Sequence, residues 1–109
     1  MVRFYMDPPR GELRILGHAG FGEKGSDPVC AGVSALVLTL CRRVEELADQ
    51  DAVRILALAA EPGAAYVRCT PLPGHETQAE EVFRVIAAGL RLLAKEYPGY
   101  VGEAGEGRE

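Results

Sequence analysis

The sequence contains no tryptophan, only two histidines and only three cysteines among its 109 residues. The cysteines, Cys30, Cys41 and Cys69, form no C-x-x-C pair, so neither a zinc-ligand pattern nor a disulfide framework is present. We therefore expect no metal and no cofactor. Three unpaired thiols are typical of a protein in a reducing compartment.

Long apolar runs are also missing. No stretch of about 18 apolar residues could cross a membrane, and the N-terminal residues lack the apolar segment of a signal peptide. We therefore expect a cytoplasmic location and no membrane partner. The net charge of −4 and the pI near 5.2 argue against direct nucleic-acid binding, which depends on clustered Lys and Arg, and favour a basic protein partner.

The chain is long enough for one domain with a single core, which we assign to residues 1–101. Residues 102–109 alternate glycine with charge and are expected to form a disordered acidic and glycine-rich tail.

The pattern of apolar residues predicts two strand pairs, each followed by a helix. Residues 2–6 and 12–17 form the first expected hairpin, and residues 53–60 and 64–70 the second. Apolar residues at spacings of three and four predict helices from Asp27 to about Gln50 and from Thr77 to Tyr97. With a short final strand at residues 100–101, the order ββαββα predicts an α/β (α+β) fold, a two-layer sandwich with two helices on a mixed or antiparallel sheet.

The second helix has a candidate start signal. Thr77, followed three residues later by Glu80, is typical of a capping box, in which each side chain bonds a free backbone N–H of the other residue. Pro98 and Gly99 mark the end of that helix.

The richest stretch for function is GHAGFGEKGSDPVCAGVSAL, residues 17–36. Asp27 is a good N-cap and Pro28 suits the first helical position, which places Cys30 in the first turn of the helix. A helix N-terminus and a nearby imidazolium both favour thiolate over thiol, so Cys30 is a candidate nucleophile and His18, at a strand end, a candidate base. Free N–H groups of that first turn are expected to bind an oxyanion.

The GHA element, the glycine-rich loop and G-x-D-x-x-C-A-x-V-S leading into a helix resemble the ribosomal-processing cysteine protease family, Prp. The resemblance implies that Cys30 and His18 are the catalytic pair, and its supporting positions include Gly17, Asp27 and Ser34. Two residues depart from the family pattern: Pro28 stands where we expect a branched aliphatic residue, and Gly32 where we expect alanine. Glycine in a helix costs about 1 kcal/mol relative to alanine.

Several supporting residues have two readings. Asp27 can cap the helix and also orient an imidazole, and we favour the cap. Ser34, one turn after Cys30, either lines the site or permits close helix packing. Gly25, with Gly20 and Gly22, makes the loop either a lid or a connection with unusual backbone angles.

The remaining histidine and cysteines have less support as site residues. Cys41 and Cys69 are expected in the core. His75 is the rival base, but no spacing argument links it to Cys30.

The resulting hypothesis is a cysteine endopeptidase. The resemblance implies a homodimer that removes an N-terminal extension from a large-subunit ribosomal protein during ribosome assembly. The alternative is a ribosome-associated binding or assembly protein with no protease activity. A third reading is a redox-sensing thiol at Cys30, although no resolving cysteine lies beside it in sequence.

Overall fold

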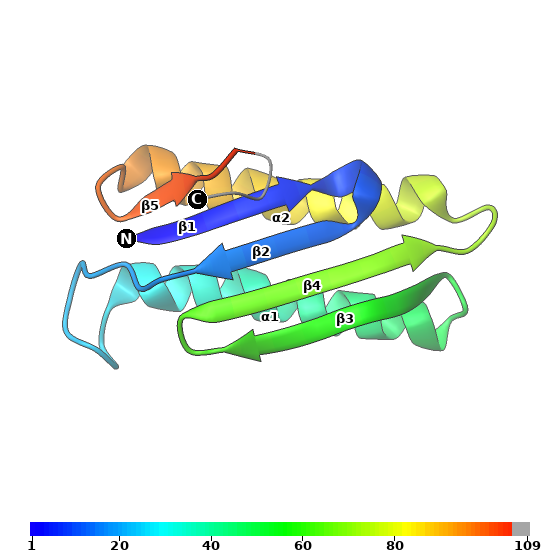
Figure 1. The fold of residues 1–109 in the computed structure, drawn as a ribbon, viewed down its shortest axis with the longest axis horizontal. Helices are drawn as coiled ribbons and strands as arrows, with labels where there is room; N and C mark the ends of the chain where they lie inside the picture. Colours follow the sequence, from blue (N-terminus) through cyan, green and yellow to red (C-terminus); the bar gives the residue numbers. More distant parts are fainter. Residues whose placement is uncertain (106–109) are drawn as a thin grey trace.

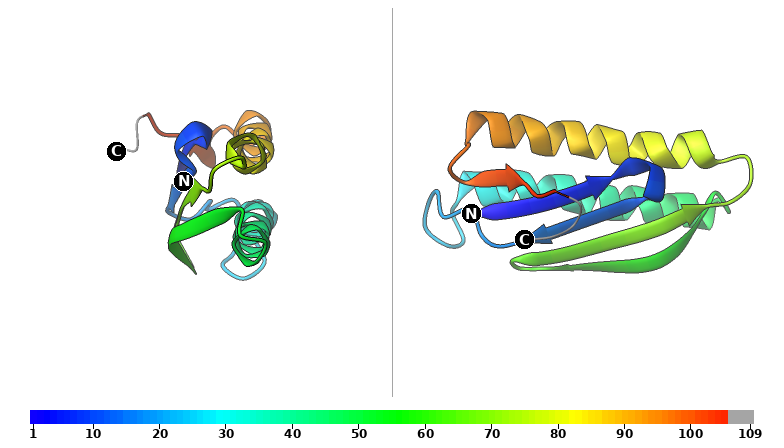
Figure 2. Two further views of the ribbon diagram at one scale, coloured as in Figure 1. Left: turned by 90° about the vertical axis from the view of Figure 1, so that its right-hand side faces the viewer. Right: turned by 45° about the horizontal axis from the view of Figure 1, so that its top comes forward.

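Two long helices lie on one face of a five-stranded sheet in the computed structural model, which describes residues 1–105 (Figure 1). The elements are β1 (Val2–Asp7), the 3-10 helix η1 (Pro8–Arg10), β2 (Glu12–Leu16), α1 (Pro28–Asp49), β3 (Val53–Glu61), β4 (Ala64–Pro71), α2 (Glu76–Glu96) and β5 (Val101–Glu103). Figure 2 shows that both helices cover the same face and leave the other face of the sheet open. The predicted two-layer α+β sandwich is confirmed.

The strand order in the sheet is β3-β4-β2-β1-β5. The two hairpins are antiparallel, β2 joins them by pairing antiparallel with β4, and β5 pairs parallel with β1. The sheet is therefore mixed, which resolves the choice that the sequence left open. In the part of the chain that the structure describes, no helix is both long and apolar enough to cross a membrane.

The core lies between the sheet and the helices. Along β1, Val2, Phe4 and Met6 are buried while the residues between them are more exposed, as the alternation of side chains in a strand requires. Both helices present a buried apolar stripe at spacings of three and four to the same layer. Fully burying one side chain such as Phe83 stabilises the fold by about 1.5–3 kcal/mol, so this layer holds the sandwich together.

The expected capping box at Thr77 and Glu80 is wrong. Helix α2 begins at Glu76, its N-cap is His75, and His75 makes no side-chain capping bond. The N–H of Gly74 donates to the Glu76 side chain at 3.1 Å, and the N–H of His75 donates to the Leu72 carbonyl at 3.0 Å. This turn starts the helix before Thr77, which consequently lies inside the first turn.

The final strand is longer than expected. Val101 pairs with Val2, and the ladder continues to Glu103 beside Phe4, two residues into the segment predicted as a tail. The N–H of Ala104 also donates to the Phe4 carbonyl at 2.7 Å. The last four residues of the predicted tail, residues 106–109, lie outside the described residues.

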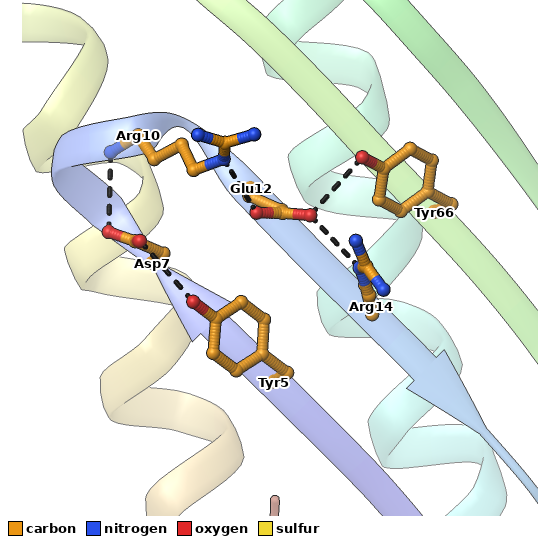
Figure 3. Close-up of polar contacts among 6 residues, drawn as sticks. All are labelled: Tyr5, Asp7, Arg10, Glu12, Arg14 and Tyr66. Carbon is orange, nitrogen blue, oxygen red and sulfur yellow. Dashed lines mark hydrogen bonds and ion pairs between the residues drawn. The ribbon is translucent and has the colours of Figure 1, made fainter. Parts of the chain in front are cut away.

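A buried carboxylate holds a polar network on the open face of the sheet (Figure 3). Glu12 accepts bonds from the side chains of Arg10 at 3.0 Å, Arg14 at 2.9 Å and Tyr66 at 3.2 Å. Burial works to raise the pKa of Glu12, but the bonds from Arg14 and Tyr66 outweigh it, so that pKa is lowered. The network links β2 to β4 and the start of β2 to η1.

Candidate active site

The loop between β2 and α1 and the turn between β3 and β4 lie at the same end of the sheet (Figure 1). This follows from the pairing of β2 with β4, because Leu16 at the end of β2 lies opposite Ala64 at the start of β4. The sheet thus brings the segment that carries His18 next to a turn more than forty residues away in sequence.

Asp27 fastens the loop to the start of α1. One carboxylate oxygen accepts from the N–H groups of Val29 at 2.9 Å and Cys30 at 3.2 Å; the other accepts from those of Phe21 and Gly22, both at 2.9 Å. These bonds, led by that from Gly22, hold the pKa of Asp27 below its usual value, against the opposing effect of burial. The expected N-cap is present.

The second reading of Asp27, as the group that orients the imidazole, receives no contact in support. Both carboxylate oxygens face backbone donors, and within residues 1–105 His18 is not one of their partners.

Cys30 is half-buried in the first turn of α1, at the positive end of the helix dipole. The N–H of Ala19 donates to its Sγ at 3.3 Å. The residue next to His18 therefore contacts the sulfur directly.

The first-turn N–H groups are not free, contrary to the expectation that they are available to an oxyanion. Pro28 has no N–H, those of Val29 and Cys30 donate to the Asp27 side chain, and that of Ala31 donates to the Asp27 carbonyl at 3.0 Å. The cap that starts the helix has used these donors. Among the described contacts, the N–H directed at Sγ is that of Ala19.

Gly17 and His18 follow β2 directly. Gly17 has φ of +98°, and a Cβ at this position would lie 2.3 Å from the Met1 carbonyl oxygen, so only glycine fits here. Its N–H donates to the carbonyl of Gly63 at 2.9 Å. His18 itself is exposed, with its ring beside Gly63 in the β3–β4 turn.

A cavity of about 520 Å³ joins these residues. Its walls come from the β2–α1 loop, one side of α1 and the β3–β4 turn, and they carry mostly apolar side chains with a few charged ones. All six residues predicted for the site line it: Gly17, His18, Gly25, Asp27, Cys30 and Ser34. The structure therefore brings together the base, the nucleophile and the supporting residues that the sequence picked out, while their roles remain predictions.

An aromatic cluster contacts the loop between β2 and α1 at Phe21. The ring of Phe21 meets those of Tyr97 and Tyr100 edge-on, with centroids 5.3 Å and 5.1 Å apart. Gly25 has φ of +91°, which fits the reading of the loop as a connection with unusual backbone angles. The reading of the loop as a lid stays a prediction.

The other cysteines and the second histidine lie elsewhere. Cys41 and Cys69 are in the core, where burial raises the pKa of both thiols. His75 precedes α2, with its Nδ1 3.2 Å from the Gln78 side-chain oxygen, and is not among the cavity residues within 1–105. No group of three or more His, Cys, Asp or Glu side chains in that range could hold a metal ion.

Sequence reasoning missed the contribution of the β3–β4 turn. Glu61, Pro62 and Gly63 line the cavity, although the sequence marked them only as a hairpin turn. No local signal in the sequence could have found them, because their place at the cavity depends on the pairing of β4 with β2.

Comparison with known proteins identifies relatives of this arrangement. The family model described as cysteine protease Prp matches residues 3–102. A search of curated protein sequences gives no match.

Three solved structures share the fold. The ribosomal processing protease Prp from S. aureus, in complex with a covalently linked product peptide, superposes with a TM-score of 0.73 at 22% identity, covering 94% of each chain. The same protease with a substrate peptide gives a TM-score of 0.68 at 18% identity, covering 95% of this chain and 98% of that one. SMU.848 from Streptococcus mutans gives 0.62 at 27% identity, covering 94% of this chain and 89% of that one.

Proposed function

This chain belongs to the Prp family of cysteine proteases, and from that premise we propose that Cys30 is its nucleophile and His18 its general base. The observation that carries the proposal is the shared cavity: the Cys30 sulfur lies in a first helical turn, accepts a backbone N–H from the residue after His18, and lines the same cavity as His18. A nucleophile and a base at one cavity are the minimum that acyl transfer requires.

The mechanism follows from these positions. The Cys30 thiol proton passes to His18 as Sγ bonds to the carbonyl carbon of the substrate. The carbon–nitrogen bond then breaks, and the leaving amine takes the proton from His18. This leaves a thioester on Cys30. Water attacks that thioester, giving its proton to His18; the carbon–sulfur bond breaks, and the thiolate recovers the proton.

Charge on the carbonyl oxygen needs a donor near Sγ. The first-turn N–H groups of α1 are engaged by Asp27, whereas the N–H of Ala19 is directed at the sulfur itself. We assign the Ala19 N–H as the donor to the oxyanion. When the carbonyl carbon bonds to Sγ, its negative oxygen lies beside the sulfur, and the Ala19 N–H can donate to that oxygen instead of to Sγ.

The substrate that we propose is the precursor of a large-subunit ribosomal protein, from which the protease removes an N-terminal extension. The support is family membership and the S. aureus ribosomal processing protease, which has the same fold and is known with a substrate peptide and with a product peptide. The apolar side chains of the cavity, among them Val33, Val37 and Leu38, fit an extended peptide with apolar side chains.

We further propose that the protein acts in the cytoplasm, which its three unpaired cysteines favour, and that it is a homodimer, as the resemblance implies. Exposed apolar side chains on α2, Val85 and Leu92, support burial against a second copy. Light scattering at micromolar concentration should give twice the 11.7 kDa chain mass. A single-chain mass at all concentrations would refute the dimer.

The test of the function is cleavage of the host's own ribosomal protein precursor, followed by mass spectrometry. We expect cleavage at one site, a loss of at least about a thousandfold in Cys30→Ala, and a loss of about 10²–10⁴-fold in His18→Ala. Cys41→Ala is the matched thiol control, since Cys41 lies on the same helix but in the core, and it should cleave at nearly the wild-type rate when folded. Binding of the precursor without cleavage would favour a binding or assembly protein instead.

A further inference from the structure

The tip of the β3–β4 hairpin is in direct contact with the ring of His18. Gly63 has φ of +79°, and a Cβ built on it would lie 2.6 Å from His18 Nε2, 3.0 Å from Cε1 and 3.4 Å from Cδ2. The space between Gly63 and the imidazole is therefore too small for a Cβ. No side chain fits between them unless the ring moves.

The backbone of the same glycine is bonded to the same segment. The Gly63 carbonyl accepts the N–H of Gly17 at 2.9 Å, and two residues further on the N–H of Ala19 reaches the Cys30 sulfur at 3.3 Å. His18 lies between these two fixed points. Its backbone is thus held by the hairpin tip on one side and by the nucleophile on the other.

We propose that Gly63 is a positioning residue for His18, setting where the imidazole lies relative to Cys30. This inference rests on the proposed function, in which His18 is the base. Proton transfer depends on hydrogen-bond distance, and a displacement of about 1 Å can cost about a hundredfold in rate. Glycine is needed at position 63 for two separate reasons: its positive φ and its contact with the ring.

A pair of alanine variants separates these two reasons. Gly63→Ala introduces both backbone strain and the contact with His18. Gly74→Ala introduces similar strain, since Gly74 has φ of +91°, but its Cβ would meet nothing within 4 Å. We expect both variants to lose stability in urea unfolding. Only Gly63→Ala should lose kcat, by about 10–100-fold, while Gly74→Ala stays within about twofold of wild type.

The two histidines provide a readout that does not depend on activity. The NMR signals of the imidazole Cε1–H groups are two in number, one from His18 and one from His75, and His18→Ala assigns them. Gly63→Ala should shift the His18 signal while leaving the His75 signal in place. Gly74→Ala should leave the His18 signal unchanged. Because Gly74 precedes His75, this variant should instead shift the His75 signal, which makes it the reverse control.

Gly63→Asn covers the case in which the alanine variant fails to fold. Asparagine accepts positive φ more readily than alanine but still carries a Cβ, so it should regain stability without regaining kcat or the wild-type His18 signal. Wild-type kcat and an unshifted His18 signal in a folded Gly63 variant would overturn the inference. Failure of the wild type to cleave, or cleavage by Cys30→Ala, would refute the proposed function instead, and the NMR comparison would still decide whether Gly63 positions the ring.

Discussion

Replacing Gly32 by alanine should stabilise the protein, although it changes a residue two positions from Cys30. Gly32 lies inside α1 on the side that meets α2, and a Cβ there would lie 3.4 Å and 3.7 Å from the two methyl groups of Leu93, which is ordinary contact. Alanine is favoured over glycine in a helix by about 1 kcal/mol. The new methyl group adds some apolar burial, so we expect a gain of about 1 kcal/mol or slightly more, or about 4–8 °C in Tm.

Gly89 provides the matched control on the other helix. It too lies inside a helix at the contact between α1 and α2, but a Cβ there would lie 2.7 Å and 3.0 Å from the methyl groups of Leu36. The same gain in helix propensity is then opposed by about 1–3 kcal/mol of overpacking. Gly89→Ala should therefore range from neutral to about 2 kcal/mol less stable than wild type.

Urea and thermal unfolding of the two variants test this argument. Gly32→Ala should also keep the wild-type cleavage rate, because Gly32 is not among the cavity residues within the described range. If Gly32→Ala is destabilised, or if the two variants shift by the same amount, the packing derived for the helix pair is wrong.

Three further predictions concern the loop and the open face. The pKa of Asp27 is lowered in the fold, so its contribution to stability is present above about pH 4, the unfolded value, and is lost as the pH falls through the lower folded value. The stability difference between wild type and Asp27→Asn in urea should accordingly shrink below about pH 4, and a constant difference would contradict the cap. Glu12→Gln should cost about 1–2 kcal/mol in urea unfolding, near the low end for charged hydrogen bonds because Arg10 and Arg14 are half-exposed; an unchanged midpoint would contradict the role of the network. Phe21→Ala should alter global stability little, because Phe21 is 46% exposed, but should speed trypsin cleavage after Lys24 as measured by mass spectrometry, and an unchanged rate would show that the aromatic contacts do not hold the loop.

The order of the elements could be predicted because each depends on local pattern. The spacing of the apolar residues from Val29 to Leu47 predicts a long helix. Its start is set by Pro28 and by Asp27, whose side chain accepts the N–H groups of the residues two and three positions later. The start of α2 was predicted wrongly because that prediction also used a local pattern alone. A capping box at Thr77 competes with the turn that Gly74 and Glu76 form, and the motif alone does not rank the two.

The surroundings of the candidate site could be predicted only in part. Cys30 and Asp27 belong to one helix terminus, so sequence spacing brings them together. The contact of His18 with Gly63 depends on the pairing of β2 with β4, which no local pattern specifies. The expectation that the first-turn N–H groups are free was wrong for a physical reason: a strong N-cap satisfies the same N–H groups that an uncapped helix would offer.

The measurement that tests the central claim most directly is the intact mass of the protein after acid quenching during turnover of the ribosomal protein precursor. The account predicts a thioester adduct whose mass equals that of the N-terminal fragment less one water, mapped to the peptide that contains Cys30 and absent from Cys30→Ala. Cleavage with no adduct in wild type, or an adduct on Cys41 or Cys69, would contradict the assignment of Cys30 as the nucleophile.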